Sequence, residues 1–82
     1  MECVMADCKI RLSSLSAGQR AMITRIHVSD ALRERLTALG FLEGTKICCL
    51  GAGPSGDPVA YEVRRTIIAL RRADCDGIEV LC

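Results

Sequence analysis

Short segments in which apolar and polar residues alternate dominate this chain, and each ends within a few residues at glycine, proline or a charged turn. Such alternation is typical of strands that bury one face. It predicts five strands, at residues 19–27, 45–50, 59–63, 66–70 and 78–81. An 82-residue chain holds one domain with one small core. Because a small sheet avoids exposed edges best by closing on itself, we expect a β-barrel.

One helix is predicted between the first and second strands. Leu32, Leu36 and Leu39 recur at i, i+4 and i+7, a spacing that places them on one helical face. Either Ser29 or Asp30 can cap the first turn, because both side chains accept a hydrogen bond from a free backbone N–H. The fold class is therefore mostly β: a small SH3-like five-stranded β-barrel with one short helix.

The residues that follow this helix predict how it ends. Gly40 suits the left-handed backbone position just after the last turn, and Phe41 then stands where a contact back to Leu36 is expected. The N-terminal residues show no clean periodicity. We interpret residues 1–10 as a tail or an added edge segment, and residues 11–82 as the barrel domain.

The cysteines leave a metal site open as an alternative. They are Cys3, Cys8, Cys48, Cys49, Cys75 and Cys82. No CxxC is present, and none of the spacings is standard for zinc, so structural or incidental thiols are favoured. Cys3, Cys8 and Cys75 are weak candidate ligands for a transition metal, iron or zinc. A metal-binding or thiol redox-sensing protein is the second function considered, and native mass spectrometry with added metal would test it.

The N-terminal sequence has no apolar core of a secretory signal, so we expect a cytoplasmic protein in a reducing compartment. The longest apolar runs are far shorter than the roughly 20 residues that span a bilayer. The 11 basic and 10 acidic residues nearly balance, and only 2% of residues are aromatic. This composition argues against nucleic acid as a partner, including for an RNA-binding barrel.

No pattern of catalytic residues emerges, and we expect no enzyme. Gly51, Gly53 and Gly56 formally match a dinucleotide-binding fingerprint, but the next segment alternates like a strand instead of opening a helix. A hairpin loop is the favoured interpretation. His27, the single histidine, stands at the end of a predicted strand without a nucleophile motif near it.

Two charged segments are interpreted as turns. The pair Arg64 and Arg65 falls between two predicted strands, where it indicates a tight hairpin. Residues 71–74 are polar and turn the chain again, and residues 74–76 are expected to form a solvated turn.

The helix and the loop after it resemble the FeoA family, ferrous iron transport protein A. The resemblance rests first on residues 32–47, LRERLTALGFLEGTKI. It continues in Leu12-x-x-Leu15-x-x-Gly18-x-x-Ala21-x-Ile23, in Gly56-Asp57-Pro58-Val59-Ala-Tyr61-x-Val63, and in residues 68–71 and 78–80. Arg65 stands where the family often has glycine, so the hairpin differs here.

The resemblance implies an SH3-like barrel that serves as a small cytosolic accessory of bacterial ferrous iron uptake. Its implied partner is the membrane transporter FeoB, through the cytosolic G-protein domain of that protein. By this resemblance, we expect it to reach the membrane only through the transporter. A homo-oligomer is the second kind of assembly considered, because an exposed barrel edge can pair with the same edge of another copy.

A contact surface for this partner is predicted on the helix, the turn after it, the long loop and the hairpin tip, because binding concentrates on loops of a rigid scaffold. Its residues are Leu32, Arg35, Leu39, Gly40, Phe41, Leu42, Gly56, Asp57, Pro58, Arg64 and Arg65. A sharper hypothesis has Arg64 or Arg65 reach the nucleotide of the partner as an arginine finger, against the plainer reading of a solvated hairpin tip.

Overall fold

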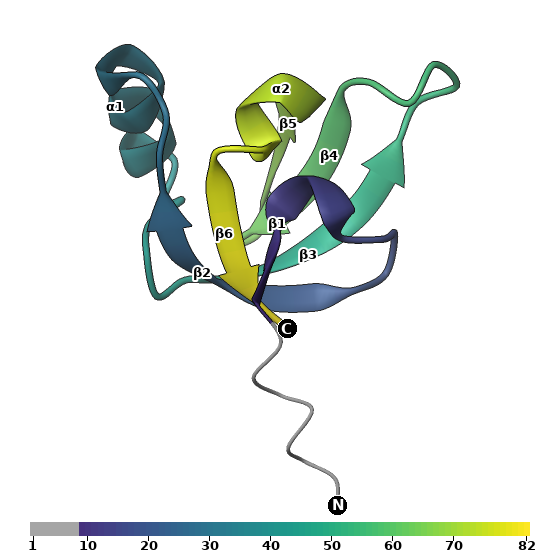
Figure 1. Cartoon of the computed structure of the whole chain (residues 1–82), viewed down its shortest axis with the longest axis horizontal. Helices are drawn as coiled ribbons and strands as arrows, with labels where there is room; N and C mark the ends of the chain where they lie inside the picture. Colours follow the sequence, from purple (N-terminus) through teal and green to yellow (C-terminus); the bar gives the residue numbers. More distant parts are fainter. Residues whose placement is uncertain (1–8) are drawn as a thin grey trace, which may run out of the picture.

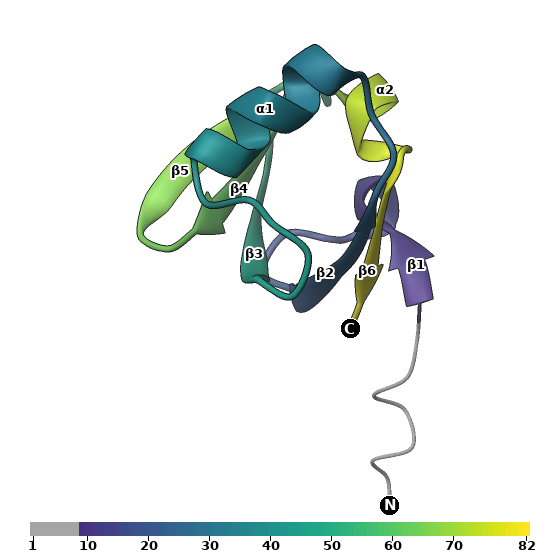
Figure 2. The same ribbon diagram turned by 90° about the vertical axis from the view of Figure 1, so that its left-hand side faces the viewer.

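A computed structural model describes residues 9–82, which form one six-stranded antiparallel sheet with two helices. The strands are β1 Lys9–Arg11, β2 Arg20–Ile26, β3 Lys46–Ala52, β4 Val59–Val63, β5 Thr66–Leu70 and β6 Ile78–Leu81. The helices are α1 Asp30–Ala38 and α2 Arg72–Cys75, and a 3-10 turn spans Leu12–Ser14. The sheet curls around the core, and α1 lies across its upper end (Figure 1, Figure 2).

The sheet has one strand more than predicted, because the N-terminal edge segment takes part in it. In the strand order β1-β6-β2-β3-β4-β5, the last strand, β6, lies between β1 and β2. Lys9 pairs with Leu81 and Ile10 with Val80. The expected boundary between a tail and the domain at residue 10 therefore falls inside β1. The order leaves β1 and β5 as edge strands, and Ile67 on β5 is exposed.

The core fills the inside of the curled sheet with aliphatic side chains and two aromatic rings. Alternation along β4 and β6 turns every second residue inward, as the sequence predicts, whereas in β2 the register shifts after Ile23, so that Ala21, Ile23 and Ile26 are buried. Tyr61 and Phe41 are the largest fully buried side chains. Leu12 in the 3-10 turn is fully buried too, so the segment before β2 closes one part of the core.

Helix α1 begins and ends as its sequence predicts. The Ser29 hydroxyl accepts a hydrogen bond from the Leu32 backbone N–H at 3.3 Å, which caps the first turn. Gly40 has a φ of 87°, and its N–H bonds to the Thr37 carbonyl at 3.0 Å. The Phe41 N–H reaches the Leu36 carbonyl at 2.8 Å. These bonds form a Schellman motif, which turns Phe41 down into the core.

A second helix, α2, is present where the sequence predicts only a turn. Residues 72–75 form the short helix α2 where a polar turn is predicted. Cys75 is fully buried, so the expectation of a solvated turn at residues 74–76 is wrong for this side chain. The reason is geometric: one helical turn directs Cys75 toward the core while Asp76 stays exposed.

The hairpin between β4 and β5 is as tight as predicted, but it uses unusual residues. Val63 pairs with Thr66, which leaves Arg64 and Arg65 as a two-residue loop. Their φ angles are 50° and 68°. Two-residue hairpin loops with both φ angles positive favour Asn-Gly or Gly-Gly, because a Cβ is unfavourable in that region. The two arginines therefore hold a conformation that costs free energy.

We expect Arg65→Gly to raise the free energy of unfolding by about 0.5–1 kcal/mol. Glycine relieves the left-handed strain of about 1–2 kcal/mol, and its greater freedom in the unfolded chain offsets part of this gain. Urea denaturation measures the change. Arg20→Gly, at the exposed first position of β2, is the matched control, which we expect to lower stability. Equal shifts in the same direction for both variants would contradict the strain at Arg65.

Candidate partner-binding surface

The C-terminal end of α1 and the β4–β5 hairpin meet in space, although 24 positions separate Gly40 from Arg64 in the sequence. The Arg64 side chain lies directly over Gly40: a Cβ placed on this glycine would stand 3.1 Å from Arg64 Cδ. Figure 2 shows α1 running toward this hairpin. We call Leu39, Gly40, Leu42, Arg64 and Arg65 the helix-end surface. The structure thus brings Arg64 of the hairpin against Gly40 at the helix end, two residues of the predicted contact set.

Two leucines give the helix-end surface its apolar character. Leu39 is 42% exposed and Leu42 is 38% exposed, and the two lie three positions apart at the end of α1. Arg35 is exposed one helical turn before Leu39, as expected. Leu32 is half-buried and packs on the core. An apolar patch beside cationic side chains is the composition that protein contacts favour.

Phe41 corrects the predicted contact set. Its side chain is 0% exposed, so it cannot touch a partner on the folded protein. The Schellman motif gives the reason, because it directs this position back over the helix end. Phe41 supports the helix-end surface from below, while Leu42 stays on the outside.

The other predicted segment, Gly56–Pro58, lies apart from the helix-end surface. Asp57 Oδ1 accepts a hydrogen bond from the Arg72 backbone N–H at 3.0 Å, and Arg72 Nε donates to the Gly56 carbonyl at 2.8 Å. Arg72 Nη1 also donates to the Ser13 carbonyl at 3.2 Å. The loop is therefore fixed to α2, and the five residues of β4, roughly 16 Å, separate it from the hairpin tip. The predicted surface divides into two.

The same loop shows whether Gly51, Gly53 and Gly56 form a dinucleotide-binding turn or a hairpin loop. The segment after Gly56 enters strand β4, and no helix begins there. The interpretation as a hairpin loop is confirmed.

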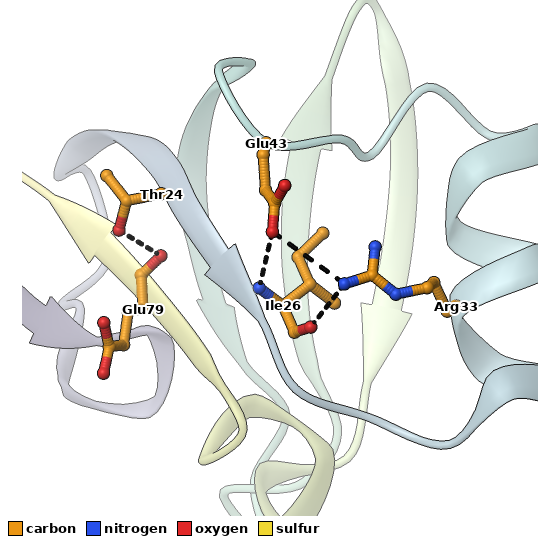
Figure 3. Close-up of polar contacts among 5 residues, drawn as sticks. All are labelled: Thr24, Ile26, Arg33, Glu43 and Glu79. Atoms are coloured by element: carbon orange, nitrogen blue, oxygen red, sulfur yellow. Dashed lines mark hydrogen bonds and ion pairs between the residues drawn. The ribbon is translucent and has the colours of Figure 1, made fainter.

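A polar cluster fixes where α1 and its following loop sit on the sheet (Figure 3). Arg33 Nη2 donates to the Ile26 carbonyl at 2.7 Å, and Glu43 Oε2 accepts from the Ile26 N–H at 3.3 Å. Arg33 and Glu43 also form an ion pair at 3.8 Å. Both side chains are about half exposed, so the ion pair itself contributes little stability. The pair instead fixes the position of α1 and the loop after it, because its two side chains bond to the N–H and the carbonyl of Ile26 at the end of β2. No local pattern predicts this pair, because Arg33 and Glu43 are ten positions apart and lie on different segments.

A second polar cluster lies inside the core. The Tyr61 hydroxyl lies 3.4 Å from the Leu12 carbonyl, to which it donates, and 3.4 Å from Cys75 Sγ. Burial raises the pKa of Tyr61 well above its ordinary value of 10.0, and the hydrogen bond to Cys75 adds to the effect. Burial likewise raises the pKa of the Cys75 thiol above 9.0, while the bond to Tyr61 opposes this rise. Both groups therefore stay protonated at neutral pH.

We expect stability to fall in alkaline solution because of this pair. A raised pKa in the folded state means that only the unfolded chain releases these protons, first from Cys75 near pH 9 and then from Tyr61 near pH 10. The contribution of this pair to the free energy of unfolding should be level below pH 8 and drop by about 3 kcal/mol by pH 10.5. Urea denaturation in reductant measures it. A Tyr61→Phe/Cys75→Ala variant showing the same drop would contradict this cause.

The positions of the cysteine side chains show whether they could bind a metal ion. Among the described residues, Cys49 and Cys75 are buried, and Cys48 and Cys82 are half-buried. Residues 9–82 bring no three His, Cys, Asp or Glu side chains together in a way that would hold a metal ion. Cys75 therefore does not fit a ligand role, because it is enclosed by the core and bonded to Tyr61. Cys3 and Cys8 lie outside the described residues.

No helix within residues 9–82 is both long enough and apolar enough to cross a bilayer.

Comparison with known proteins places this geometry among solved structures. The FeoA domain family matches residues 10–81. FeoA of Chlorobium tepidum is 36% identical, with a TM-score of 0.85, covering 88% of this chain and 69% of that one. FeoA of Stenotrophomonas maltophilia, a procaryotic SH3 domain protein solved in complex with zinc, is 31% identical, with a TM-score of 0.74 and coverage of 87% and 88%. These likenesses confirm the SH3-like fold.

A sequence relative of Porphyromonas gingivalis joins two functions in one chain. It is an Fe(2+) transport protein A/Fe(2+) transporter FeoB fusion protein, 37% identical over 71 residues. The match covers 87% of the present chain and only 8% of that relative. The similarity is thus confined to one small part of a much larger protein.

Proposed function

Because the chain belongs to the FeoA domain family, which is associated with ferrous iron transport, we propose that it is an accessory protein that binds a FeoB-type ferrous iron transporter and regulates it. The observation that carries this proposal is the fusion protein of Porphyromonas gingivalis, in which both parts share one chain. Two parts that are fused into one chain in one organism are often separate chains that bind each other in another. The proposed contact is with the cytosolic G-protein domain, so the accessory acts in the cytoplasm.

The helix-end surface is the proposed contact. It combines Leu39 and Leu42, which are exposed, with Arg64 and Arg65 on a tight turn. Phe41 below it and the Arg33–Glu43 pair beside it hold the helix end in a fixed position. A surface that is already ordered loses little conformational entropy on binding, which favours affinity.

An NMR titration tests the proposal. The labelled chain is titrated with the purified G-protein domain of its FeoB-type transporter, loaded with GDP or with a GTP analogue. We expect shifts that cluster on residues 39–44 and 64–65. Shifts confined to Gly56–Pro58, or no shifts in either nucleotide state, would overturn the helix-end surface as the contact.

Leu42→Asp should weaken this binding at least tenfold, because an exposed apolar anchor at an interface centre contributes about 2 kcal/mol or more. Leu50→Asp is the matched control, since Leu50 is 44% exposed and lies on β3, away from α1. Isothermal titration calorimetry measures both affinities, and dispersed NMR spectra verify that each variant folds. Equal losses for the two variants would show that the effect is not specific to the helix end.

The hairpin arginines allow one finer test. If Arg64 or Arg65 acts as an arginine finger, replacing both with alanine should slow the GTP turnover of the partner by orders of magnitude. Unchanged turnover with retained binding would reject the finger and leave the contact in place.

A further inference from the structure

A shallow groove of about 570 Å³ lies on the outer face of the sheet, beside the helix-end surface. Strands β2 and β3 supply its floor, and the hairpin tip closes one side. Its charged lining is unbalanced, because it contains Arg20, Lys46, Arg64 and Arg65 but only one carboxylate, that of Glu62. The whole chain has 11 basic and 10 acidic residues, so this excess of positive charge is local.

The strand register arranges these side chains in two rows. Met22 pairs with Lys46 on one side and with Leu81 on the other, which forms a row with two apolar members and one cation. Arg20 pairs with Cys48, and Cys48 pairs with Glu62 in the neighbouring row. All six belong to the groove lining. Met22 therefore has the apolar Leu81 on one neighbouring strand and the cation Lys46 on the other, with Arg20 two residues away on its own strand.

None of the four groove cations forms an ion pair with another side chain of residues 9–82, where the ion pair present is Arg33–Glu43. Glu62 does not neutralise them at contact distance either. Four cations held along one hollow without an ion-pair partner in the described part of the chain repel one another, and an anionic ligand relieves that repulsion. Like-charged clefts attract ligands of opposite charge and raise the rate of association.

We propose that this groove binds an extended acidic segment of a partner protein. Aspartate and glutamate carboxylates of the segment pair with Arg20, Lys46 and the hairpin arginines, and one apolar side chain packs on Met22 and Leu81. The inference rests on the proposed function in one respect: the natural source of the segment is the transporter. Arg64 and Arg65 belong to both surfaces, so one partner can cover both.

A peptide fits the groove better than a nucleic acid does. Binding of single strands relies on aromatic side chains on which bases stack. Tyr61 and Phe41 are both fully buried, and the groove lining contains neither. Aliphatic contacts from Met22 and Leu81 instead match an aliphatic side chain of a peptide.

Fluorescence anisotropy with a labelled nonapeptide, Gly-Glu-Asp-Glu-Leu-Glu-Asp-Glu-Gly, tests the inference on the full chain. We expect saturable binding that weakens with added salt, and at least tenfold weaker binding of the peptide with Gln and Asn in place of Glu and Asp. The double variant Arg20→Glu/Lys46→Glu should lose at least tenfold in affinity for the acidic peptide, since like charges then face each other.

The matched control is Arg25→Glu/Arg71→Glu, which changes the net charge equally at exposed positions outside the groove. We expect less than a threefold loss for it. A loss as large as that of the groove variant would overturn the inference, because bulk charge would then explain the binding. Tighter binding of a labelled oligothymidylate of equal charge would overturn it in favour of a nucleic acid. Should the double reversal unfold the protein, the milder Arg20→Ala and Lys46→Ala variants provide the same comparison.

The two proposals can fail separately. Binding of the G-protein domain without any binding of the acidic peptide removes the groove inference and leaves the proposed function. Binding of the peptide without binding of the G-protein domain removes the named partner and leaves the groove as an acidic-segment site.

Discussion

Replacing Gly77 with alanine should lower the free energy of unfolding by about 3 kcal/mol or more, close to the upper range for a single substitution. A Cβ on Gly77 would overlap the His27 carbonyl oxygen and lie 3.1 Å from its carbonyl carbon. The obstacle is backbone, so no side-chain rotation relieves it. The same carbonyl region joins β2 to β6, where the His27 N–H donates to the Gly77 carbonyl at 2.6 Å. Any shift that accommodates the methyl group therefore weakens the pairing of these strands.

Thermal and urea denaturation measure this effect. Gly53→Ala is the matched control, because a Cβ there meets nothing within 4 Å and Gly53 is not among the glycines with positive φ. We expect the control to differ from wild type by less than about 0.5 kcal/mol, as surface substitutions usually do. A Gly77→Ala variant as stable as this control would contradict the close approach of residues 27 and 77.

Phe41→Ala should cost about 3–5 kcal/mol, the usual range for removing a fully buried aromatic side chain. A domain of this length has roughly 4–12 kcal/mol of stability in total, so the variant would be marginal or unfolded at 37 °C. The loss has a local consequence too. Phe41 lies under the helix-end surface, and its N–H completes the Schellman motif of α1.

Leu42→Ala provides the contrast, because the neighbouring side chain points outward and is 38% exposed. We expect a change below about 1 kcal/mol for it. Circular dichroism during urea denaturation measures both variants. If Leu42→Ala were as destabilising as Phe41→Ala, the two side chains would share the core, and Leu42 would not be available to a partner.

The elements with strong local signals were predictable from the sequence. Alternation located the strands, and the Leu32, Leu36, Leu39 spacing with Gly40 located α1 and its end. Two elements were not predicted, because they are too short for a periodic pattern of apolar residues. Lys9–Arg11 has three residues and is a strand only because β6 pairs with it, and the single turn of α2 looks like a polar loop. Tertiary contacts decide both.

The contact surface was predicted only in part, for a similar reason. The exposed Leu42 and the hairpin arginines followed from local patterns, yet the approach of Arg64 to Gly40 depends on how α1 crosses the sheet. Phe41 was misplaced because the motif that identifies it also buries it. No local pattern identifies Arg20 and Lys46, because their shared groove arises from strand register, which no single segment encodes.

Strand β6 is the last strand in the sequence but lies inside the sheet, between β1 and β2, and this determines when the sheet can form during synthesis. Strand β1 has β6 as its neighbour, and β2 needs β6 along most of its length. A growing chain on the ribosome that has not yet released residues 78–81 therefore holds two strands with unpaired edges. Such long-range pairing slows folding and delays it until synthesis of the domain is complete. Until then, a chaperone or a partner has the best access to the strands that later enclose the core.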